Sequence, residues 1–583
     1  MNSRLGILLA VLLASVTCRA NGHDAGKDGY DEIPAGIAPL VTDDFGFTGE
    51  NVIVTAHLPM SELGGADPIS DRNNNGKANG SDLWGWTDPE TNHEYALFGR
   101  SDAMAFVDVT NANAPLYLGV MPTQSLNRLY RDVKTFGNYA YVVADVASHG
   151  MQVFDLTRLR DRTLPLDDFW MPDFVYEEFG KAHNIVINPE SGFALAVGTD
   201  TYHGGMHFLD LSNPLAPKPL GGVSELGYTH DAQAITYRGP DAEHVGREIV
   251  LGYTVDSLSI VDASDPATPV VLSRTEYEGR RYAHQGWVTD DQRYALMDDE
   301  LDELQLDQNA RTHIWNIEDL DAPKYVGYYE AQSKFTDHNL YIKGNLAYEA
   351  NYLGGLRILD ISNVENGQLK EVAWLDTQPQ IDSPYISGLW SVYPYFDSGM
   401  IIMSDMVKGL IVAKLDSEKI ELVGDFNRDG QLSAEDLQFA IVAAVGSSAD
   451  LRYDLDANGQ VDLRDASSWA RHIAEATPGD ANLDGVFNSG DFVQVFHAGE
   501  YEDDVPANST WFDGDWTGDL EFTSADLVVA FQVQRYESAS KLVPEPSCFL
   551  LIAMVSGCVI SRRLRRTTNR RRLNYTNVGI KNA

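Results

Sequence analysis

The chain has 583 residues, and its 86 acidic residues against 43 lysines and arginines give a formal net charge of −43 at pH 7. Basic residues gather at the two ends, so the body between residues 21 and 543 is more acidic still. Self-repulsion of this strength argues against nucleic acid or an anionic membrane as a partner and favours bound divalent cations. The length allows two or three domains.

The first 20 residues have the layout of a secretory signal peptide. Arg4 is followed by an apolar run from Leu5 to Val16 and by a small-residue site at Ala20. We therefore expect residues 1–20 to direct export. The cysteines of the chain fall in the two end segments, at Cys18, Cys548 and Cys558. A large core or metal ions must then stabilise the exported body without disulfides.

Residues 71–82 copy the spacing of a calcium loop. Oxygen-bearing side chains stand at positions 1, 3, 5, 9 and 12, and Gly76 stands at position 6. No apolar helix flanks this segment in the sequence, so a solvated Asn/Gly linker is an equally good interpretation.

Residues 45–420 contain one short phrase seven times: an apolar triplet, an acidic or amide residue, and a polar turn that often includes proline. The copies end at Asp108, Asp155, Asp210, Asp262, Asn316, Asp360 and Asp416, at intervals of 44 to 56 residues. Other segments, such as Tyr139 to Val143, are rich in β-branched and aromatic residues and are bounded by turn residues, which is typical of strands. The period predicts seven four-stranded blades and an all-β fold, the seven-bladed β-propeller.

The repeated phrase resembles the LVIVD repeat. Residues 82–88, 94–96 and 149–156 also resemble the choice-of-anchor B domain, and the resemblance extends over residues 45–415. It implies a propeller that is displayed at the cell surface by a separate anchoring tail. It supplies no catalytic residues to transfer, so the catalytic residues are unknown.

Histidine recurs at one position in four consecutive repeats: His183, His230, His284 and His338. Each stands at the start of the strand that we expect to be innermost in its blade, and innermost strands line the channel of a propeller. Arg131, Trp84 and Trp390 complete the circle, and turns that carry Asp145 and Glu300 return to the same face. Such a group can bind a transition metal or a substrate. The alternative is structural: each histidine bonds the backbone of the next blade and is copied with the repeat.

The sequence contains no motif of a common hydrolase or nucleotide-binding enzyme. There is no Gly-x-Ser-x-Gly elbow, no phosphate loop and no His-Glu-x-x-His helix. Paired carboxylates are numerous, but a chain this acidic produces such pairs by chance, so their spacing identifies no glycosidase. An enzymatic interpretation therefore depends on the four histidines alone.

Four loops between residues 424 and 537 have the spacing of calcium loops. The first three place oxygen-bearing side chains at positions 1, 3, 5, 9 and 12, a backbone carbonyl at position 7 and glycine at position 6, as a hard cation with six to eight oxygen ligands requires. The predicted ligands are Asp425, Asn427, Asp429, Gln431, Ser433 and Asp436 in loop 1; Asp454, Asp456, Asn458, Gln460, Asp462 and Asp465 in loop 2; Asp480, Asn482, Asp484, Val486, Asn488 and Asp491 in loop 3; and Asp515, Thr517, Asp519, Glu521, Thr523 and Asp526 in loop 4. Loop 4 has Leu520 in place of the glycine, so we expect a strained turn and an impaired affinity.

Each calcium loop precedes an apolar stretch at helical spacing and has aspartate at position 12. These duplicated loop–helix units resemble type I dockerins, and residues 424–477 and 478–537 resemble two such modules in tandem, small, all-α and EF-hand-like. The resemblance implies a cohesin-like protein partner within polysaccharide-degrading assemblies. Calcium binding follows from the residues themselves and should be coupled to folding, because such loops are poorly preformed without metal.

Residues 543–572 resemble a PEP-CTERM sorting signal. A Pro-Glu-Pro box at Pro544 to Pro546 precedes an apolar stretch from Cys548 to Ile560, and seven arginines follow between Arg562 and Arg572. The stretch is short for a permanent span of about 20 residues, and the arginines fit the positive-inside rule. We expect transient membrane insertion, with an ordinary tail anchor as the alternative.

These features predict an exported, non-catalytic propeller at the cell surface or in the extracellular matrix, attached through calcium-stabilised dockerin-like modules. One alternative is a metal-dependent hydrolase or lyase that serves polysaccharide catabolism through the four histidines. The other is a purely structural matrix component. The ligand of the propeller does not follow from the sequence.

Overall fold

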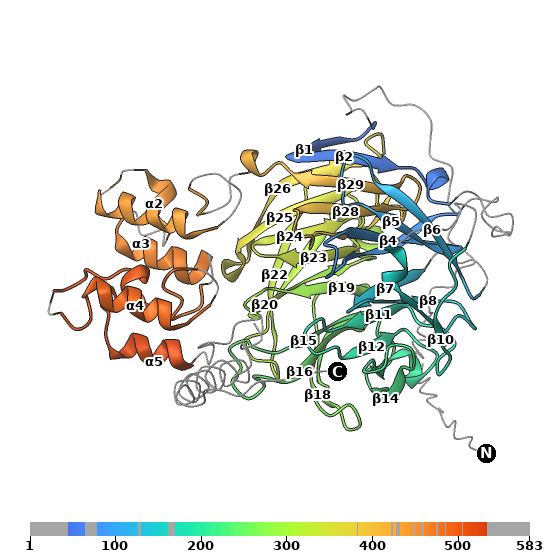
Figure 1. Ribbon diagram of the computed structural model, residues 1–583, viewed down its shortest axis with the longest axis horizontal. Coiled ribbons are helices and arrows are strands. Elements are labelled where there is room, and N and C mark those ends of the chain that lie inside the picture. The colour runs from blue at the N-terminus through green and yellow to red at the C-terminus, as the bar shows by residue number, and fades with distance from the viewer. Residues whose placement is uncertain are drawn as a thin grey trace, which may run out of the picture. The chain divides into compact units, whose positions relative to one another are not determined.

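The computed structural model describes residues 43, 45–64, 78–125, 130–160, 169–381, 383–420, 424–426, 432–446, 448, 450–455, 460–473, 476–483, 486–503 and 505–532. The expected signal peptide at residues 1–20, the expected sorting signal at residues 543–572 and residues 71–77 of the possible calcium loop lie outside these ranges. The chain divides into two compact units, Met1–Leu432 and Ser433–Ala583, and each is described by itself (Figure 1).

The described part of the first unit forms seven antiparallel sheets, which we number as blades 1 to 7 in chain order. Blades 1, 2 and 3 contain β3 (Gly80–Thr87), β4 (Glu94–Arg100), β5 (Ala103–Asp108) and β6 (Leu116–Pro122); β7 (Arg131–Phe136), β8 (Tyr139–Ala144), β9 (Met151–Asp155) and β10 (Phe174–Tyr176); and β11 (Asn184–Ile187), β12 (Ala194–Val197), β13 (Met206–Asp210) and β14 (Lys218–Val223). Blades 4 and 5 contain β15 (Asp231–Thr236), β16 (Glu248–Tyr253), β17 (Ser257–Asp262) and β18 (Val270–Glu276); and β19 (Ala283–Val288), β20 (Tyr294–Asp299), β21 (Arg311–Asn316) and β22 (Lys324–Glu330). Blades 6 and 7 contain β23 (Asn339–Lys343), β24 (Leu346–Ala350), β25 (Leu356–Asn363) and β26 (Gln368–Asp376); and β27 (Leu389–Tyr393), β28 (Met400–Asp405) and β29 (Gly409–Leu415).

The blades form a closed ring around a central channel. The first strands of the blades, β3, β7, β11, β15, β19, β23 and β27, contact their neighbours in sequence, and β27 contacts β3 to complete the circle. At the N-terminal end, β2 (Val52–Leu58) pairs with β29 as the outer strand of blade 7, and β1 (Thr48–Glu50) pairs with β26 in blade 6. The seven-bladed propeller predicted from the repeat is therefore confirmed, and its closure by N-terminal strands is an addition.

The repeated acidic residue has a local structural role. In six of the seven copies among the described residues, its side-chain oxygen accepts a hydrogen bond from the backbone N–H two residues later. These residues are Asp108, Asp155, Asp210, Asp262, Asn316 and Asp360. This is an Asx turn at the end of the third strand of these six blades, which aspartate and asparagine form equally well.

The core of the propeller lies between the blades. Each pair of neighbouring blades buries its own apolar cluster, including the pair formed by blades 7 and 1. At the interface of blades 1 and 2, for example, the rings of Phe106 and Phe154 stack with centroids 4.6 Å apart. Stability is thus spread over seven similar interfaces, as expected for sheets arranged radially.

The second unit consists of loops and short helices. The helices α2 (Ala434–Val445), α3 (Leu463–Ser468), α4 (Ser489–Ala498) and α5 (Ser524–Gln532) each begin one residue after position 9 of a predicted calcium loop. In α3 and α4 the residue at position 9, Asp462 or Asn488, is the N-cap, and the aspartate at position 12 completes a capping box. No helix within the described ranges, including α1 (Asp302–Leu306) of the propeller, is long and apolar enough to cross a membrane.

Candidate functional site

The four predicted histidines lie side by side at one end of the central channel. His183, His230 and His338 immediately precede β11, β15 and β23, and His284 is the second residue of β19. The ring centroids of successive histidines are 4.1, 4.2 and 4.5 Å apart. We call these four residues the histidine arc.

Two aromatic side chains close the histidine arc into a circle of six rings. The Trp390 ring lies 4.7 Å from the His338 ring, and the Tyr130 ring lies 5.6 Å from the His183 ring and 5.9 Å from that of Trp390. The circle surrounds a small cavity with about 10 Å³ of free space, room for about one water molecule. Its lining residues are Asp82, Tyr130, Arg131, His183, Asn184, His230, His284, His338, Asn339 and Trp390. Sequence reasoning did not find Asp82, Tyr130, Asn184 and Asn339, of which the last three each directly adjoin a predicted position.

The expectation that Trp84 lies in this circle was wrong. Asp82 lines the cavity instead. The Lys134 ammonium lies over the Trp84 ring, 4.6 Å from the centroid of that ring. The pairing of β3 with β4 shifts register between Gly80 and Leu83. The same irregularity occurs around His284 in β19 and around Trp390 in β27, so it does not set blade 1 apart. The channel-mouth position of blade 1 lies near the start of β3, two residues before the one that spacing from the repeat phrase indicates.

Hydrogen bonds between blades fix the tautomer of three histidines. The Nδ1 atoms of His230, His284 and His338 lie 3.1, 2.7 and 2.7 Å from the carbonyl oxygens of His284, His338 and Trp390. A carbonyl oxygen only accepts hydrogen bonds, so each Nδ1 carries the proton and donates the hydrogen bond. Each Nε2 therefore carries a lone pair. Such bonds are those that the structural interpretation expects, and they also leave Nε2 in the form that binds metals.

Burial keeps two members of the histidine arc, His230 and His338, uncharged at neutral pH. Desolvation lowers the pKa of His338 to about 4. It also lowers the pKa of His230 well below its ordinary value, and the neighbouring His183 and His284 act in the same direction. A neutral imidazole is the form that a metal requires.

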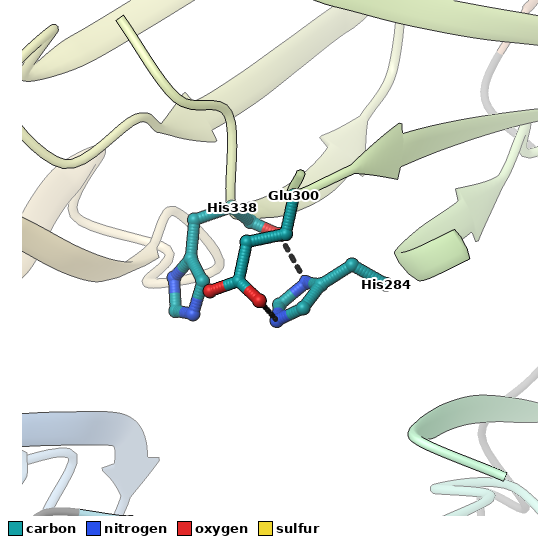
Figure 2. Close-up of side chains that lie close together, drawn as sticks. All are labelled: His284, Glu300 and His338. Carbon is teal, nitrogen blue, oxygen red and sulfur yellow. Dashed lines mark hydrogen bonds and ion pairs between the residues drawn. The ribbon is translucent and has the colours of Figure 1, made fainter. Parts of the chain in front are cut away.

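Glu300 joins the histidine arc directly after β20. Its Oε2 atom lies 3.9 Å from His284 Nε2, and its Oε1 atom accepts a 2.7 Å hydrogen bond from the Tyr352 hydroxyl. One potential ligand atom from each of His284, Glu300 and His338 lies within 4.8 Å of the other two. Figure 2 shows the Glu300 carboxylate between the two imidazole rings.

Other carboxylates of blades 5 and 6 are also buried. No oxygen of Asp298 or Asp337 has a hydrogen-bond partner among the described residues. Burial, reinforced by repulsion from neighbouring carboxylates, raises the pKa of both residues well above the ordinary value. Burial also raises the pKa of Glu349 from 4.5 to about 7.

The shift at Glu349 predicts a pH dependence of stability. Because folding raises this pKa, the contribution of Glu349 is fully present below pH 4.5 and is lost as the pH rises through 7. Replacement by glutamine should remove this loss, about 3 kcal/mol at about 1.4 kcal/mol per pKa unit. In the wild type, Glu349 Oε2 accepts a hydrogen bond from Asn351 Nδ2. Asn351 Oδ1 has no partner among the described residues, so the Asn351 amide can rotate and accept a hydrogen bond from the glutamine N–H instead.

The measurement is urea unfolding of the full chain with calcium at pH 5 and pH 8. The difference in unfolding free energy between the two pH values should shrink in Glu349→Gln. It should stay at the wild-type value in the control Glu278→Gln, since Glu278 is exposed. An unchanged difference in Glu349→Gln would contradict the prediction.

The aspartates at position 12 of the predicted calcium loops accept hydrogen bonds from the backbone of their own loops. Asp465 accepts N–H bonds from Leu455 and Asp462, Asp491 from Ala481 and Asn488, and Asp526 from Trp516 and Thr523, at 2.7 to 3.0 Å. In loop 1, Asp436 accepts the N–H of Ser433 at 3.0 Å. The partners are at positions 2 and 9, so one carboxylate connects both ends of each of loops 2, 3 and 4.

Loop 4 has the most completely described set of ligand residues. Carboxylate oxygens of Asp515, Asp519 and Asp526 lie within 4.8 Å of one another. The Oγ1 atom of Thr517, at position 3, is buried without a partner among the described residues. Burial raises the pKa of Asp515 to about 6, and repulsion from Asp526 and Asp519 acts in the same direction. These observations fit a cation at the loop centre.

Leu520 takes the left-handed conformation that position 6 requires, with φ +69°. Gly518, two residues earlier, also has positive φ, so two left-handed residues build this turn. The Asp515 carboxylate accepts N–H bonds from Gly518 and Leu520 at 2.7 and 3.0 Å. The strain expected from the sequence is therefore present, and the loop still brings its carboxylates together.

Several predicted calcium ligands cannot be placed. Asn427, Asp429, Gln431, Asp456, Asn458 and Asp484 lie outside the described residues. Loop 1 also extends over the boundary between the two units. Among the described ligands, the carboxylates of Asp425, Asp436, Asp465, Asp480, Asp491, Asp515 and Asp526 are buried.

The fold and the channel mouth define the class of protein: a seven-bladed β-propeller with polar and aromatic side chains at one end of its channel. Within this class, the chain contains LVIVD repeats, which match at residues 129–148, 253–276 and 338–371. The second and third of these segments extend into the outer strands of blades 4 and 6.

Two solved structures are similar to the chain at low sequence identity. The Myceliophteria thermophila Cps50 (Swd1) β-propeller domain is 11% identical with a TM-score of 0.38, over 58% of this chain and 96% of that chain. Kuenenia stuttgartiensis hydrazine synthase is 13% identical with a TM-score of 0.40, over 57% and 94%. Neither likeness carries an inference about activity. No curated protein matches the chain.

Proposed function

We propose that the protein is an exported, non-catalytic scaffold whose propeller presents a binding face and whose second unit attaches it to a protein partner through calcium-dependent dockerin-like modules. The observation that carries the proposal is the repeated bonding of the position-12 aspartates, which connect positions 2 and 9 of loops 2, 3 and 4. The signal peptide and the PEP-CTERM-like tail expected from the sequence support a surface or matrix location.

Calcium would neutralise the repulsion between the carboxylates of these loops. Asp515, Asp519 and Asp526 repel one another at a distance that a cation with oxygen ligands at 2.3–2.6 Å bridges. Thr517 Oγ1 offers a further, neutral oxygen at the same loop. Binding relieves the repulsion, so calcium should stabilise the helices that follow the loops.

Chelation tests this proposal on the full chain. With excess calcium, the second unit should resist protease, and titration should show several bound ions. With EGTA, cleavage should concentrate after residue 424 and helical circular dichroism should fall. Capture by a type I cohesin domain, used as the probe, should require calcium. Unchanged protease resistance and helicity in EGTA would refute the calcium-dependent modules. Failure of the cohesin domain to capture the chain in calcium would refute the attachment role.

The enzymatic alternative, a metal-dependent hydrolase or lyase of polysaccharide, is favoured by one observation, the convergence of His284, Glu300 and His338. The cavity volume weighs against it. The free space is about 10 Å³, far below the roughly 300–1,000 Å³ of sites that enclose an organic ligand. The channel mouth therefore suits an ion better than a sugar chain.

A further inference from the structure

We propose that the channel mouth binds one divalent transition metal through His284, Glu300 and His338, with zinc as the best-suited ion. This site goes beyond the scaffold function, which requires calcium in the second unit and no metal in the propeller. It is carried by three side chains whose potential ligand atoms lie within 4.8 Å of one another.

The two imidazoles are already oriented for a metal. His284 Nδ1 donates to the His338 carbonyl and His338 Nδ1 donates to the Trp390 carbonyl, both at 2.7 Å. Metal-bound histidines almost always donate their second ring nitrogen to a carbonyl or carboxylate, which fixes the tautomer and the ring orientation. Neighbouring blades supply these carbonyls here, so ring closure holds both Nε2 atoms in place.

The carboxylate is held in the same way. Tyr352 donates to Glu300 Oε1, and Oε2 faces His284 Nε2 at 3.9 Å. This separation is too long for a hydrogen bond. Zinc lies 2.0–2.2 Å from nitrogen and oxygen ligands, so two ligand atoms at a tetrahedral angle are about 3.4 Å apart. An ion between Oε2 and Nε2, which are 3.9 Å apart, therefore requires these two atoms to approach by about 0.5 Å.

The composition of the site selects the ion. Two nitrogens and one carboxylate suit zinc and its first-row neighbours, whereas calcium and magnesium take oxygen ligands. Three protein ligands leave a fourth position for water or for an anionic oxygen. The His230 ring lies 4.2 Å from the His284 ring.

The carboxylates that follow the second strands of blades 2 and 4 are paired with cations, so they do not form a metal site with the histidines. After β8, Asp145 faces His183 but also binds the Lys181 ammonium at 2.7 Å. After β16, Asp256 binds the exposed Arg274 at 2.9 Å. Within the described ranges, Glu300 is the carboxylate that shares a metal-sized space with two histidines. Blades 5 and 6 thus hold the site.

The test is zinc titration of the full chain by calorimetry, with millimolar calcium present to fill the loops of the second unit. Elemental analysis after gel filtration should give one zinc per propeller. Substituted with cobalt(II), the site should show the intense ligand-field absorption of a low-coordinate ion. If the folded wild type retained no zinc after gel filtration and showed no intense cobalt absorption, the proposal would be overturned.

Three variants remove ligands with little change in packing. His284→Asn and His338→Asn retain a side-chain N–H at the place of Nδ1 but lack Nε2, and Glu300→Gln retains the acceptor for Tyr352. Each should weaken zinc binding by about 100-fold or more, since even partners of metal ligands are worth 10- to 100-fold. Thermal unfolding without zinc reports whether a variant folds.

A competing cluster provides the control. Asp241, His244 and Asp321 also bring ligand atoms within 4.8 Å of one another, with Asp321 exposed. His244→Asn should leave zinc and cobalt binding unchanged. Loss of the tight zinc in His244→Asn, or its retention in the three channel variants, would overturn the assignment.

Discussion

Replacing Asp491 with alanine should remove one calcium ion from the full chain and unfold loop 3 together with the start of α4. The buried Asp491 carboxylate accepts the N–H groups of Ala481, Asn482 and Asn488 at 2.9, 3.3 and 2.8 Å. Hydrogen bonds to a charged group contribute about 1.5–3 kcal/mol each. The loss should therefore exceed about 4 kcal/mol in the second unit, before the lost ligand is counted.

Calcium stoichiometry by calorimetry and limited proteolysis measure this effect. The propeller should keep its protease resistance, because the substitution lies in the second unit. Asp491→Asn should give an intermediate result, since its amide oxygen can still accept a hydrogen bond but carries no charge. Glu502→Ala, an exposed acidic residue of the same unit, serves as the control. An unchanged calcium count in Asp491→Ala would show that loop 3 does not bind the ion through this residue.

Local patterns predicted the blades because each blade is local in sequence. The strand periodicity and the Asx residue at the end of each third strand recur within about 50 residues, a period typical of propeller repeats. The closing strand β2 escaped prediction because its partner is far away in the chain, with Val52 opposite Leu415. A short strand carries no local sign of such a partner.

At the channel mouth too, residues set by the local repeat could be predicted, whereas those set by contacts between blades could not. His183, His230, His284 and His338 could be placed because the repeat carries each of them to the start of an inner strand. Tyr130 could not, because its contacts with His183 and Trp390 arise only when the ring closes. Glu300 was placed on the correct face, but its approach to two histidines depends on the turn after β20, whose geometry the spacing does not define.

Lys134 is a further residue whose role depends on ring closure. Its ammonium lies 2.6 Å from Asp132 and 3.6 Å from Asp82, which come from β7 and β3. Burial acts against the charge, but these aspartates raise the pKa of Lys134 well above its ordinary value. Asp231 of β15 also interacts with it, and burial raises the pKa of Asp231 to about 6. One lysine thus compensates aspartates from three blades.

Lys134→Met should destabilise the propeller by about 3–5 kcal/mol, because it leaves buried carboxylates without their counter-charge. The loss should be smaller at pH 5 than at pH 8, since aspartates with raised pKa values then take up protons. Urea unfolding at both pH values measures this. Lys134→Met combined with Asp132→Asn should recover part of the stability, whereas Lys324→Met at an exposed position of β22 should have little effect. If Lys134→Met were as stable as the wild type at pH 8, the aspartates would have to be neutral in the native ring, and the lysine would contribute packing against Trp84 rather than charge.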